Sequence, residues 1–357
     1  MTRQGWASRP SWDALLAPLG QPPRIEEREP SLWSHGWQHA ASLATLQSFR
    51  EQVVFPALPP AGQALLRSQA GHQAGAWLTA IPTDAGTTLL PQHMHLALRR
   101  RLRLPLPLTR HRCGAGLHVR GCGGLLDIYG DHALACPRSG ALARRASILE
   151  RAWIRVAREA VGPEGRVVPQ QALAATHAPV PAGDLRRLDL VVHGATPHGE
   201  ALCCDATLVS PLTRAGVPAH GAHTRNGAAL DAAQQRKRQR YPELLQPGPQ
   251  RLLVLAAELG GRWHADCHEL IRLLVATRAP RAPAALRAAA AAGLRRRWWS
   301  LLSVAVQRAV ASTALGGEWL APPQPAAGED APPLAAVLAL APAGGPSRMP
   351  MRMPDSL

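Results

Sequence analysis

Three cysteines and one histidine within a short stretch of the sequence are residues of the types that bind zinc. They are Cys113, Cys122, His132 and Cys136. Three thiolates and one imidazole form the ligand set of closed, tetrahedral, structural zinc sites. The step of nine residues after Cys113 is longer than the spacing of the Cys pairs in common zinc fingers, so His111 or His118 is an alternative to this cysteine. The pattern predicts a zinc knuckle, and the competing interpretation is a loop with incidental cysteines.

Two aspartates lie in successive strand-like segments that are joined by the sequence GATPHG. If these segments pair about that turn with His193 opposite Glu200, Asp189 lies opposite Cys204 and next to Asp205. Carboxylates among apolar residues are costly, and a bound Mg²⁺ or Mn²⁺ would offset the cost. The pattern predicts a metal site for phosphodiester hydrolysis. The competing interpretation makes each aspartate an ordinary surface residue.

A positively charged side chain is the third requirement of such chemistry, because it stabilises charge on the reacting phosphate. Restriction-type nucleases place a lysine two residues after the second carboxylate, a position that Thr207 occupies here. Lys237 is the only lysine in the chain, and it lies on a predicted helix with Tyr241 four residues later on the same face. We expect Lys237 to act in place of Thr207. The alternative is that Lys237 belongs to an ordinary solvated basic run.

Five segments carry these residues and their surroundings: CGGLLDIYGDHALAC, RRLDLVV, CCDATLVSPL, QQRKRQRY and ELGGRW. They resemble the C-terminal region of non-LTR retrotransposon polyproteins with a restriction-like endonuclease. The resemblance covers roughly residues 75 to 315, because AWLTAIPT and ALRRRLRLPLP also resemble the segment that leads into the knuckle. It implies a CCHC knuckle followed by a PD-(D/E)XK nuclease core. The residues that match the nuclease motifs are Arg187 and Asp189, then Asp205, then Lys237 and Tyr241.

The chain departs from that family in three ways. Leu188 replaces the proline of the first motif. Gln170 and Gln171 stand where relatives often have glutamate, so Glu150 on the preceding predicted helix becomes the candidate for a third metal-binding carboxylate. No polymerase motif with paired aspartates after an aromatic residue is present, so the resemblance implies a retroelement-derived chain without the reverse transcriptase.

Periodicity in the sequence predicts the elements that must position these residues. Helical spacing of apolar residues covers 63–77, 92–103, 146–161, 228–241, 265–277 and 283–315, and strand-like runs cover 166–173, 185–193, 201–210 and 251–258. This order is typical of an α/β sheet covered by helices. We therefore expect an α/β fold with a restriction-endonuclease-like core, a small zinc knuckle and flanking helices.

The expected organisation has five parts. They are a mostly helical or irregular region at 1–108, the knuckle at 109–140, the nuclease core at 145–280, a basic helix at 281–318 and a disordered tail at 319–357. The tail is rich in Pro, Ala and Gly and shows no periodicity, which favours disorder.

The charge balance favours a polyanionic partner. The chain has 40 Lys plus Arg against 24 Asp plus Glu, a net charge of +16, with basic runs at 100–104, 236–240 and 295–299. Arginine makes bidentate contacts with phosphate, so DNA is the expected partner and RNA the alternative. A coding bias toward arginine would explain the charge without a function. No signal sequence and no apolar run of bilayer length is present, so we expect a nuclear or cytoplasmic chain with no membrane partner.

These features predict a metal-dependent DNA endonuclease with structural zinc and catalytic Mg²⁺ or Mn²⁺. The alternative is a catalytically inactive zinc-knuckle module that binds nucleic acid, or a retroelement remnant. The intact aspartates and Lys237 favour the enzyme, whereas the missing third acid favours the inactive module.

Overall fold

A computed structural model describes residues 42, 45–106, 112–114, 121–139 and 141–315. Contacts divide the chain into two units, 1–317 and 318–357, and every described residue belongs to the first. The tail predicted for 319–357 and the first 41 residues of the region predicted for 1–108 lie outside the described part. Among the described residues, no helix combines the length and the apolar character that a membrane span requires.

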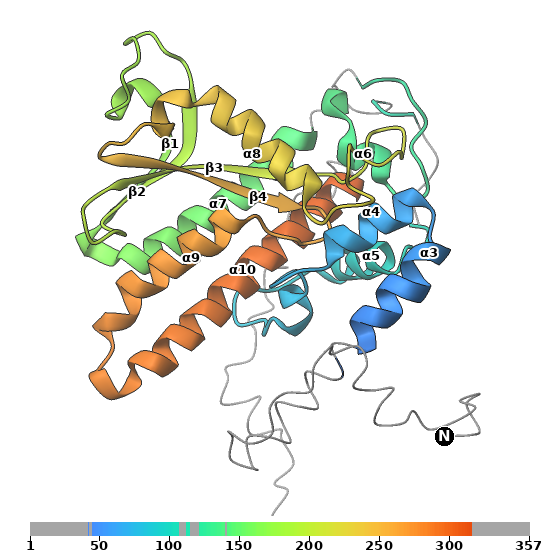
Figure 1. Cartoon of the computed structure of the whole chain (residues 1–357), viewed down its shortest axis with the longest axis horizontal. Helices are drawn as coiled ribbons and strands as arrows, with labels where there is room; N and C mark the ends of the chain where they lie inside the picture. Colours follow the sequence, from blue (N-terminus) through green and yellow to red (C-terminus); the bar gives the residue numbers. More distant parts are fainter. Residues whose placement is uncertain (1–41, 43–44, 107–111, 115–120, 140, 316–357) are drawn as a thin grey trace, which may run out of the picture. The chain divides into compact units, whose positions relative to one another are not determined.

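The centre of the fold is a four-stranded mixed sheet in the order β1-β2-β3-β4 (Figure 1). Strands β1, β2 and β3 form an antiparallel meander, and β4 pairs in parallel with β3. The strands are β1 (Arg166–Ala172), β2 (Arg187–His193), β3 (Ala201–Val209) and β4 (Gln250–Glu258). The parallel pair is connected through helix α8, as parallel neighbours require a long crossover.

Helices cover both faces of the sheet (Figure 1). Helices α7, α9 and α10 pack in one apolar cluster with β3 and β4, and α8 packs in a second cluster on the other side. Their bounds are α7 (Ala141–Val161), α8 (Ala228–Arg240), α9 (Ala265–Arg278) and α10 (Arg287–Leu315). The apolar residues of α7 recur at helical spacing, which gives this helix one strongly apolar face for the sheet.

Shorter helices precede the sheet. They are α3 (Phe55–Ala57), α4 (Pro60–Gln69), α5 (Pro91–Arg101) and α6 (Asp131–Ala135). A π-helical turn and single 3₁₀ turns complete the helical elements: η4 (Arg50–Val54), η5 (Ala76–Thr79), η6 (Pro137–Ser139), η7 (Gly162–Glu164), η8 (Leu173–Ala175), η9 (Pro242–Leu245), η10 (Ala279–Arg281) and η11 (Ala284–Leu286).

The ELGGRW segment has a packing role at the end of β4. A Cβ atom on Gly260 would lie 2.3 Å from Ser68 Oγ, and one on Gly261 would lie 2.5 Å from the carbonyl oxygen of Ala74. The backbone N–H of Arg262 donates to the carbonyl oxygen of Ser68 at 2.9 Å. The two glycines therefore let α4 and the following loop dock directly on the core.

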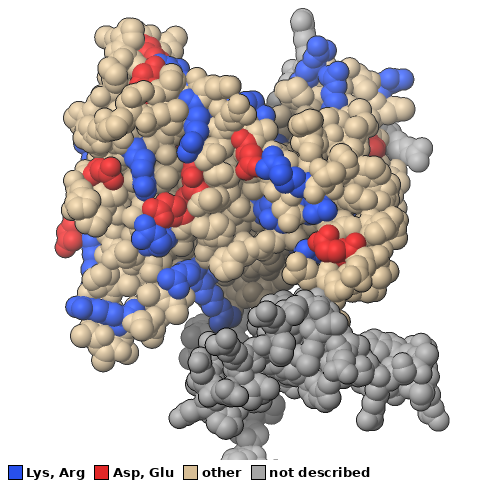
Figure 2. Space-filling view, viewed as in Figure 1, with Lys and Arg blue, Asp and Glu red and all other residues tan. Residues whose placement is uncertain are grey.

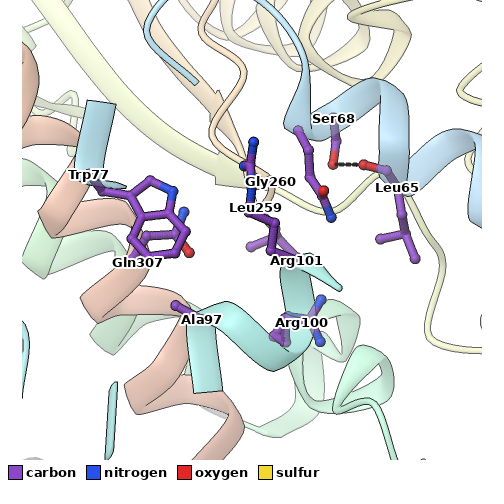
Figure 3. Close-up of a pocket in the computed structure, with 10 residues that line it drawn as sticks. Leu65, Ser68, Trp77, Ala97, Arg100, Arg101, Leu259, Gly260 and Gln307 are labelled. Atoms are coloured by element: carbon purple, nitrogen blue, oxygen red, sulfur yellow. Dashed lines mark hydrogen bonds between the residues drawn. The ribbon is translucent and has the colours of Figure 1, made fainter. Parts of the chain in front are cut away.

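A small cavity remains at this junction. Figure 3 shows its lining side chains, which come from α4, α5, η5, α10 and the loop after β4. Its volume of about 20 Å³ leaves room for about one water molecule. The cavity is too small for an organic ligand, so it is a packing defect of the docking surface.

The structure confirms the predicted α/β class and places an element in each predicted segment of the described region. One boundary is wrong: the helix expected over 63–77 ends at Gln69, and the backbone then turns through Gly71 and Gln73, which both have positive φ.

The predicted register of the β2–β3 hairpin is also wrong by one residue. The observed partners are Leu190 with Cys204 and Val192 with Leu202. His193 is therefore not opposite Glu200, because the connecting loop extends to Glu200, whose carbonyl oxygen accepts from Thr196 Oγ1 at 3.0 Å. A one-residue slip moves side chains to the opposite face of a sheet, so it matters for the site.

Candidate metal centres

The four predicted zinc ligands meet at one point. The ligand atoms of Cys113, Cys122, His132 and Cys136 all lie within 4.8 Å of one another. The Sγ atoms of Cys113 and Cys136 are 3.9 Å apart, and Cys122 Sγ is 3.1 Å from His132 Nε2. This Cys₃His cluster could hold a metal such as zinc. His111 and His118, the alternatives to Cys113, lie outside the described residues.

Glycines shape the loop that carries the first two cysteines. The N–H of Cys113 donates to the carbonyl oxygen of Gly124 at 2.8 Å, and the N–H of Gly123 donates back to the carbonyl oxygen of Cys113 at 3.1 Å. A Cβ atom on Gly121 would lie 2.1 Å from that same oxygen. Hydrogen bonding from the backbone N–H of Gly124 lowers the pKa of the Cys122 thiol to about 6, which favours the thiolate that metals bind.

Asp127 orients the other two ligands. Its carboxylate accepts backbone N–H bonds from Tyr129, Asp131 and His132, at 2.8, 3.1 and 2.7 Å. These bonds satisfy donors at the start of α6, which otherwise have no partner within the helix. His132 and Cys136 are four residues apart across this short helix, so Asp127 fixes the direction from which both reach the cluster.

The two predicted aspartates converge where β2 and β3 separate. Continuing the observed register by one residue brings Asp189 opposite Asp205, where the expected register had placed Cys204. The regular pairing stops there, and Asp189 Oδ2 accepts the backbone N–H of Ala206 at 2.7 Å instead. The carboxylate thus takes the place of a strand backbone, and both aspartates lie at the same point of the sheet.

Lys237 approaches this pair from α8. Its Nζ atom is 2.7 Å from Asp205 Oδ1, and the Asp205 side chain is only 3 % exposed. Leu230, Ala233 and Lys237 follow one another at helical spacing on the side of α8 that faces the sheet. Lys237 is half-buried there, whereas its neighbours Arg236 and Arg238 are exposed. The lysine is therefore part of the buried face rather than of the solvated basic run.

Negative charge on both aspartates is unfavourable in this buried environment. Burial and, after it, the nearby negative charge of Asp205 together raise the pKa of Asp189 to about 7, against the opposing effects of the Ala206 N–H and Lys237. Asp205 Oδ2 is buried without a hydrogen-bond partner among the described residues. A buried carboxylate oxygen without a partner is costly, and a divalent cation is a ligand that would relieve this cost.

Tyr241 and Arg187 contribute through the backbone of β2. The Tyr241 hydroxyl donates to the carbonyl oxygen of Arg187 at 2.6 Å, and burial raises the pKa of Tyr241 above its usual value. The Arg187 side chain is exposed, and its guanidinium donates to the carbonyl oxygen of Gln170 at 3.4 Å. Tyr241 therefore anchors the strand that carries Asp189. The Arg187 side chain instead contacts the backbone of Gln170 on β1.

Glu150, the candidate third carboxylate, lies near this region without joining it. Its Oε1 atom accepts from Gln170 Nε2 at 2.7 Å. The residues on either side of Gln170 in β1 pair with the residues on either side of Asp189 in β2, whereas the register skips Gln170 itself, which has a positive φ. Within the described part of the chain, the Cys₃His cluster is the one group of three or more acidic, Cys or His ligands. Glu150 thus binds Gln170 rather than joining the aspartates, which stay a pair in this structure.

Sequence reasoning missed Arg145, which lies at the N-terminal part of α7 and is buried. The signal was present, because Arg145 is one turn before Leu149 on the apolar face of that helix, with Trp153 further along the same face. An arginine at such a position needs a partner, and its partners come from segments distant in the sequence.

No protein-family model matches the chain, and no curated protein is similar enough to it to count as a match. The chemistry of these centres is therefore inferred from their own geometry.

Proposed function

We propose that the chain is a metal-dependent DNA endonuclease that nicks one strand, with a restriction-endonuclease-like core and a zinc knuckle. The observation that carries the proposal is the convergence of Asp189, Asp205 and Lys237, with one buried oxygen of Asp205 left without a partner. The element order, with three antiparallel strands, a crossover helix and a parallel strand, supports the core assignment. The resemblance of the sequence segments to retrotransposon nucleases supports it as well.

The two aspartates, Lys237 and Tyr241 would have different roles in the reaction. Asp189 and Asp205 would hold Mg²⁺ or Mn²⁺, because hard cations prefer carboxylate oxygens. When bound, such an ion would polarise the phosphate and lower the pKa of the attacking water. Lys237, which forms an ion pair with Asp205, would also contact the bound phosphate and stabilise the negative charge that develops on it. Tyr241 would keep the strand that carries Asp189 in place.

The proposed partner is DNA, with RNA as the alternative, in the nucleus or cytoplasm. Figure 2 shows Lys and Arg side chains spread over one face of the molecule, with acidic side chains between them. The three basic runs differ in what they offer. Arg100 pairs with Asp131 and Arg297 pairs with Glu159, each at 3.1 Å, so these two cations are engaged internally. In the run of α8, Arg236, Arg238 and Arg240 are exposed, so this run supplies free charge next to the aspartates.

One observation favours a second function. The aspartate pair is not grouped with a third metal-binding side chain among the described residues. A pair of carboxylates with a bound lysine would also suit a catalytically inactive protein that holds nucleic acid through its exposed arginines. This second candidate is the retroelement-derived binding module expected as the alternative from the sequence.

Plasmid nicking distinguishes the two functions. Zinc-loaded full-length protein is incubated with supercoiled plasmid and Mg²⁺, Mn²⁺ or neither. The endonuclease predicts open circular product with a divalent ion only, and none with the Asp205→Asn variant. Binding of the same plasmid without nicking under any of these conditions would reject the enzyme and support the binding module.

A further inference from the structure

A pocket of about 330 Å³ lies at the end of β3 and is lined by residues of this strand, the loop that follows it and helices α6, α7 and α8. Its polar lining consists of Arg145, Thr207, Ser210, Thr213 and Arg236. No Asp or Glu side chain is among the described residues that line it. The other described lining residues are Leu, Ala and Val, so the polar groups of the pocket are two guanidinium groups and three hydroxyl groups, all of which can donate hydrogen bonds to an anion.

Arg145 gives the pocket a built-in positive charge. Its side chain comes from α7 and is buried, with 5 % of the residue exposed. One guanidinium nitrogen donates to the carbonyl oxygen of Leu134 in α6, and the other donates to that of Leu208 at the end of β3, at 2.7 Å. Both partners are neutral, and no described carboxylate forms an ion pair with this arginine. The buried charge is thus held in place without being neutralised, which is costly unless an anion joins it.

The position of the pocket relates it to the aspartate pair. Thr207 follows Asp205 by two residues on β3, so both side chains point to the same side of the sheet, about 7 Å apart along the strand. Arg236 precedes Lys237 on α8. The pocket is therefore next to the proposed catalytic centre.

We propose that this pocket binds a backbone phosphate of the nucleic-acid strand next to the phosphate held at the aspartate pair. Arg145 and Arg236 supply the charge, and the hydroxyl groups of Ser210 and Thr213 supply further donors. The inference rests on the proposed function for the second phosphate position. It also gives Arg145 a linking role, because this side chain hydrogen-bonds both to the strand of Asp205 and to α6, which contains His132 and directly precedes Cys136 of the Cys₃His cluster.

The test measures binding in the absence of cleavage. Full-length zinc-loaded protein is titrated against a fluorescein-labelled 12-nucleotide single strand by anisotropy, at constant ionic strength and without added Mg²⁺ or Mn²⁺. The informative variants are Thr213→Glu, which brings a negative charge to the pocket, and Arg236→Gln. Their matched controls are Thr224→Glu, an exposed loop position outside the pocket, and Arg158→Gln, an exposed position at the far end of α7.

The proposal predicts at least a tenfold weaker affinity for Thr213→Glu, a smaller loss for Arg236→Gln and a change within twofold for both controls. The log-log salt slope should fall by roughly one phosphate contact in Arg236→Gln, about 0.7 for a single strand. Arg145 is buried, so an Arg145→Lys variant, which keeps the charge, is informative only if its melting curve matches that of the parent. Thr213→Glu is therefore the main test.

Three outcomes would overturn the inference. Pocket variants that bind like their controls would show that the strand does not enter the pocket, even if the parent nicks plasmid. Binding of inorganic phosphate that Thr213→Glu abolishes, with unchanged oligonucleotide affinity, would show a site for a free anion. A parent that does not bind the oligonucleotide at low salt would reject both proposals. If the parent never nicks plasmid but Thr213→Glu still binds the oligonucleotide more weakly than the parent does, the result would support the phosphate-binding pocket and reject the nuclease.

Discussion

The two candidate metal centres differ in completeness. The Cys₃His cluster brings four ligand atoms together within 4.8 Å, and hydrogen bonds to the carbonyl oxygen of Gly124 and to the carboxylate of Asp127 hold the backbone around the ligands. The aspartate pair offers two carboxylates. Among the described residues, one buried oxygen of Asp205 has no hydrogen-bond partner, and its other oxygen forms an ion pair with Lys237. A complete closed ligand set is typical of structural sites, whereas open coordination positions are typical of catalytic ones.

This difference implies opposite energetic roles. Removing a ligand from the Cys₃His cluster should cost stability, because metal binding at such sites contributes directly to folding. Removing charge from the aspartate pair should cost activity and add stability, because functional sites often hold groups in unfavourable environments. The predictions below test this contrast.

The largest effect is expected at the aspartate pair. Asp189→Asn and Asp205→Asn should each reduce the rate of plasmid nicking by roughly a thousandfold, which corresponds to about 4 kcal/mol of lost transition-state stabilisation. The double variant should resemble each single variant, because both residues serve the same ion. Initial rates from gel densitometry measure this, and additive losses would argue for two independent sites.

Substitution of a ligand in the Cys₃His cluster should have a similarly large effect on the zinc content. Cys122→Ser and His132→Ala should each lower the zinc content of the purified chain from about one ion to a small fraction, because tetrahedral sites depend on the full ligand set. Both variants should also melt at lower temperature than the parent. Metal analysis and a melting curve check this. Cys203→Ala, which removes a buried thiol from the sheet, is the matched control and should retain the zinc.

A smaller loss is expected at Lys237. Lys237→Gln should reduce nicking by roughly a hundredfold, the magnitude typical of one charged group that stabilises a transition state. Arg158→Gln removes the same charge from an exposed site on α7 and should leave the rate within twofold of the parent. Equal rates for the two variants would show that Lys237 is a structural partner of Asp205 only.

The smallest effect is a change in melting temperature with pH. The pKa of Asp189 is raised to about 7 in the folded chain, from its ordinary value of 3.8, mainly by burial. Ionisation of Asp189 therefore costs stability progressively as the pH rises between these two values. Without added Mg²⁺ or Mn²⁺, Asp189→Asn should melt a few degrees above the parent at pH 8, and the gain should vanish near pH 4.

The control for this prediction has the opposite sign. Arg155 lowers the pKa of Asp84 to about 2 through a side-chain hydrogen bond, so the ionised Asp84 stabilises the fold above its ordinary pKa of 3.8, and this contribution is lost as the pH falls toward 2. Asp84→Asn should therefore melt below the parent at pH 8. A gain for Asp84→Asn, or a loss for Asp189→Asn at that pH, would contradict the proposed contrast.

Most of the described sheet and its helices could be predicted from the sequence, because apolar periodicity marks both element types. The hairpin register could not, since the point where a loop such as Gly194–Glu200 ends depends on its own hydrogen bonds. The pairing of Lys237 with Asp205 was predictable from the buried stripe of α8. The role of Arg145 was not, because its carbonyl partners at Leu134 and Leu208 lie far away in the sequence.

Manganese binding tests the central contrast most directly. The parent, Asp205→Asn and His132→Ala, each purified in the presence of zinc, are titrated with Mn²⁺, and free Mn²⁺ is measured by electron paramagnetic resonance. The account predicts about one Mn²⁺ per parent chain beside the zinc, and none for Asp205→Asn, which should keep its zinc. His132→Ala should lose zinc instead. Equal Mn²⁺ binding by the parent and Asp205→Asn would contradict the assignment of the second metal centre to the aspartate pair.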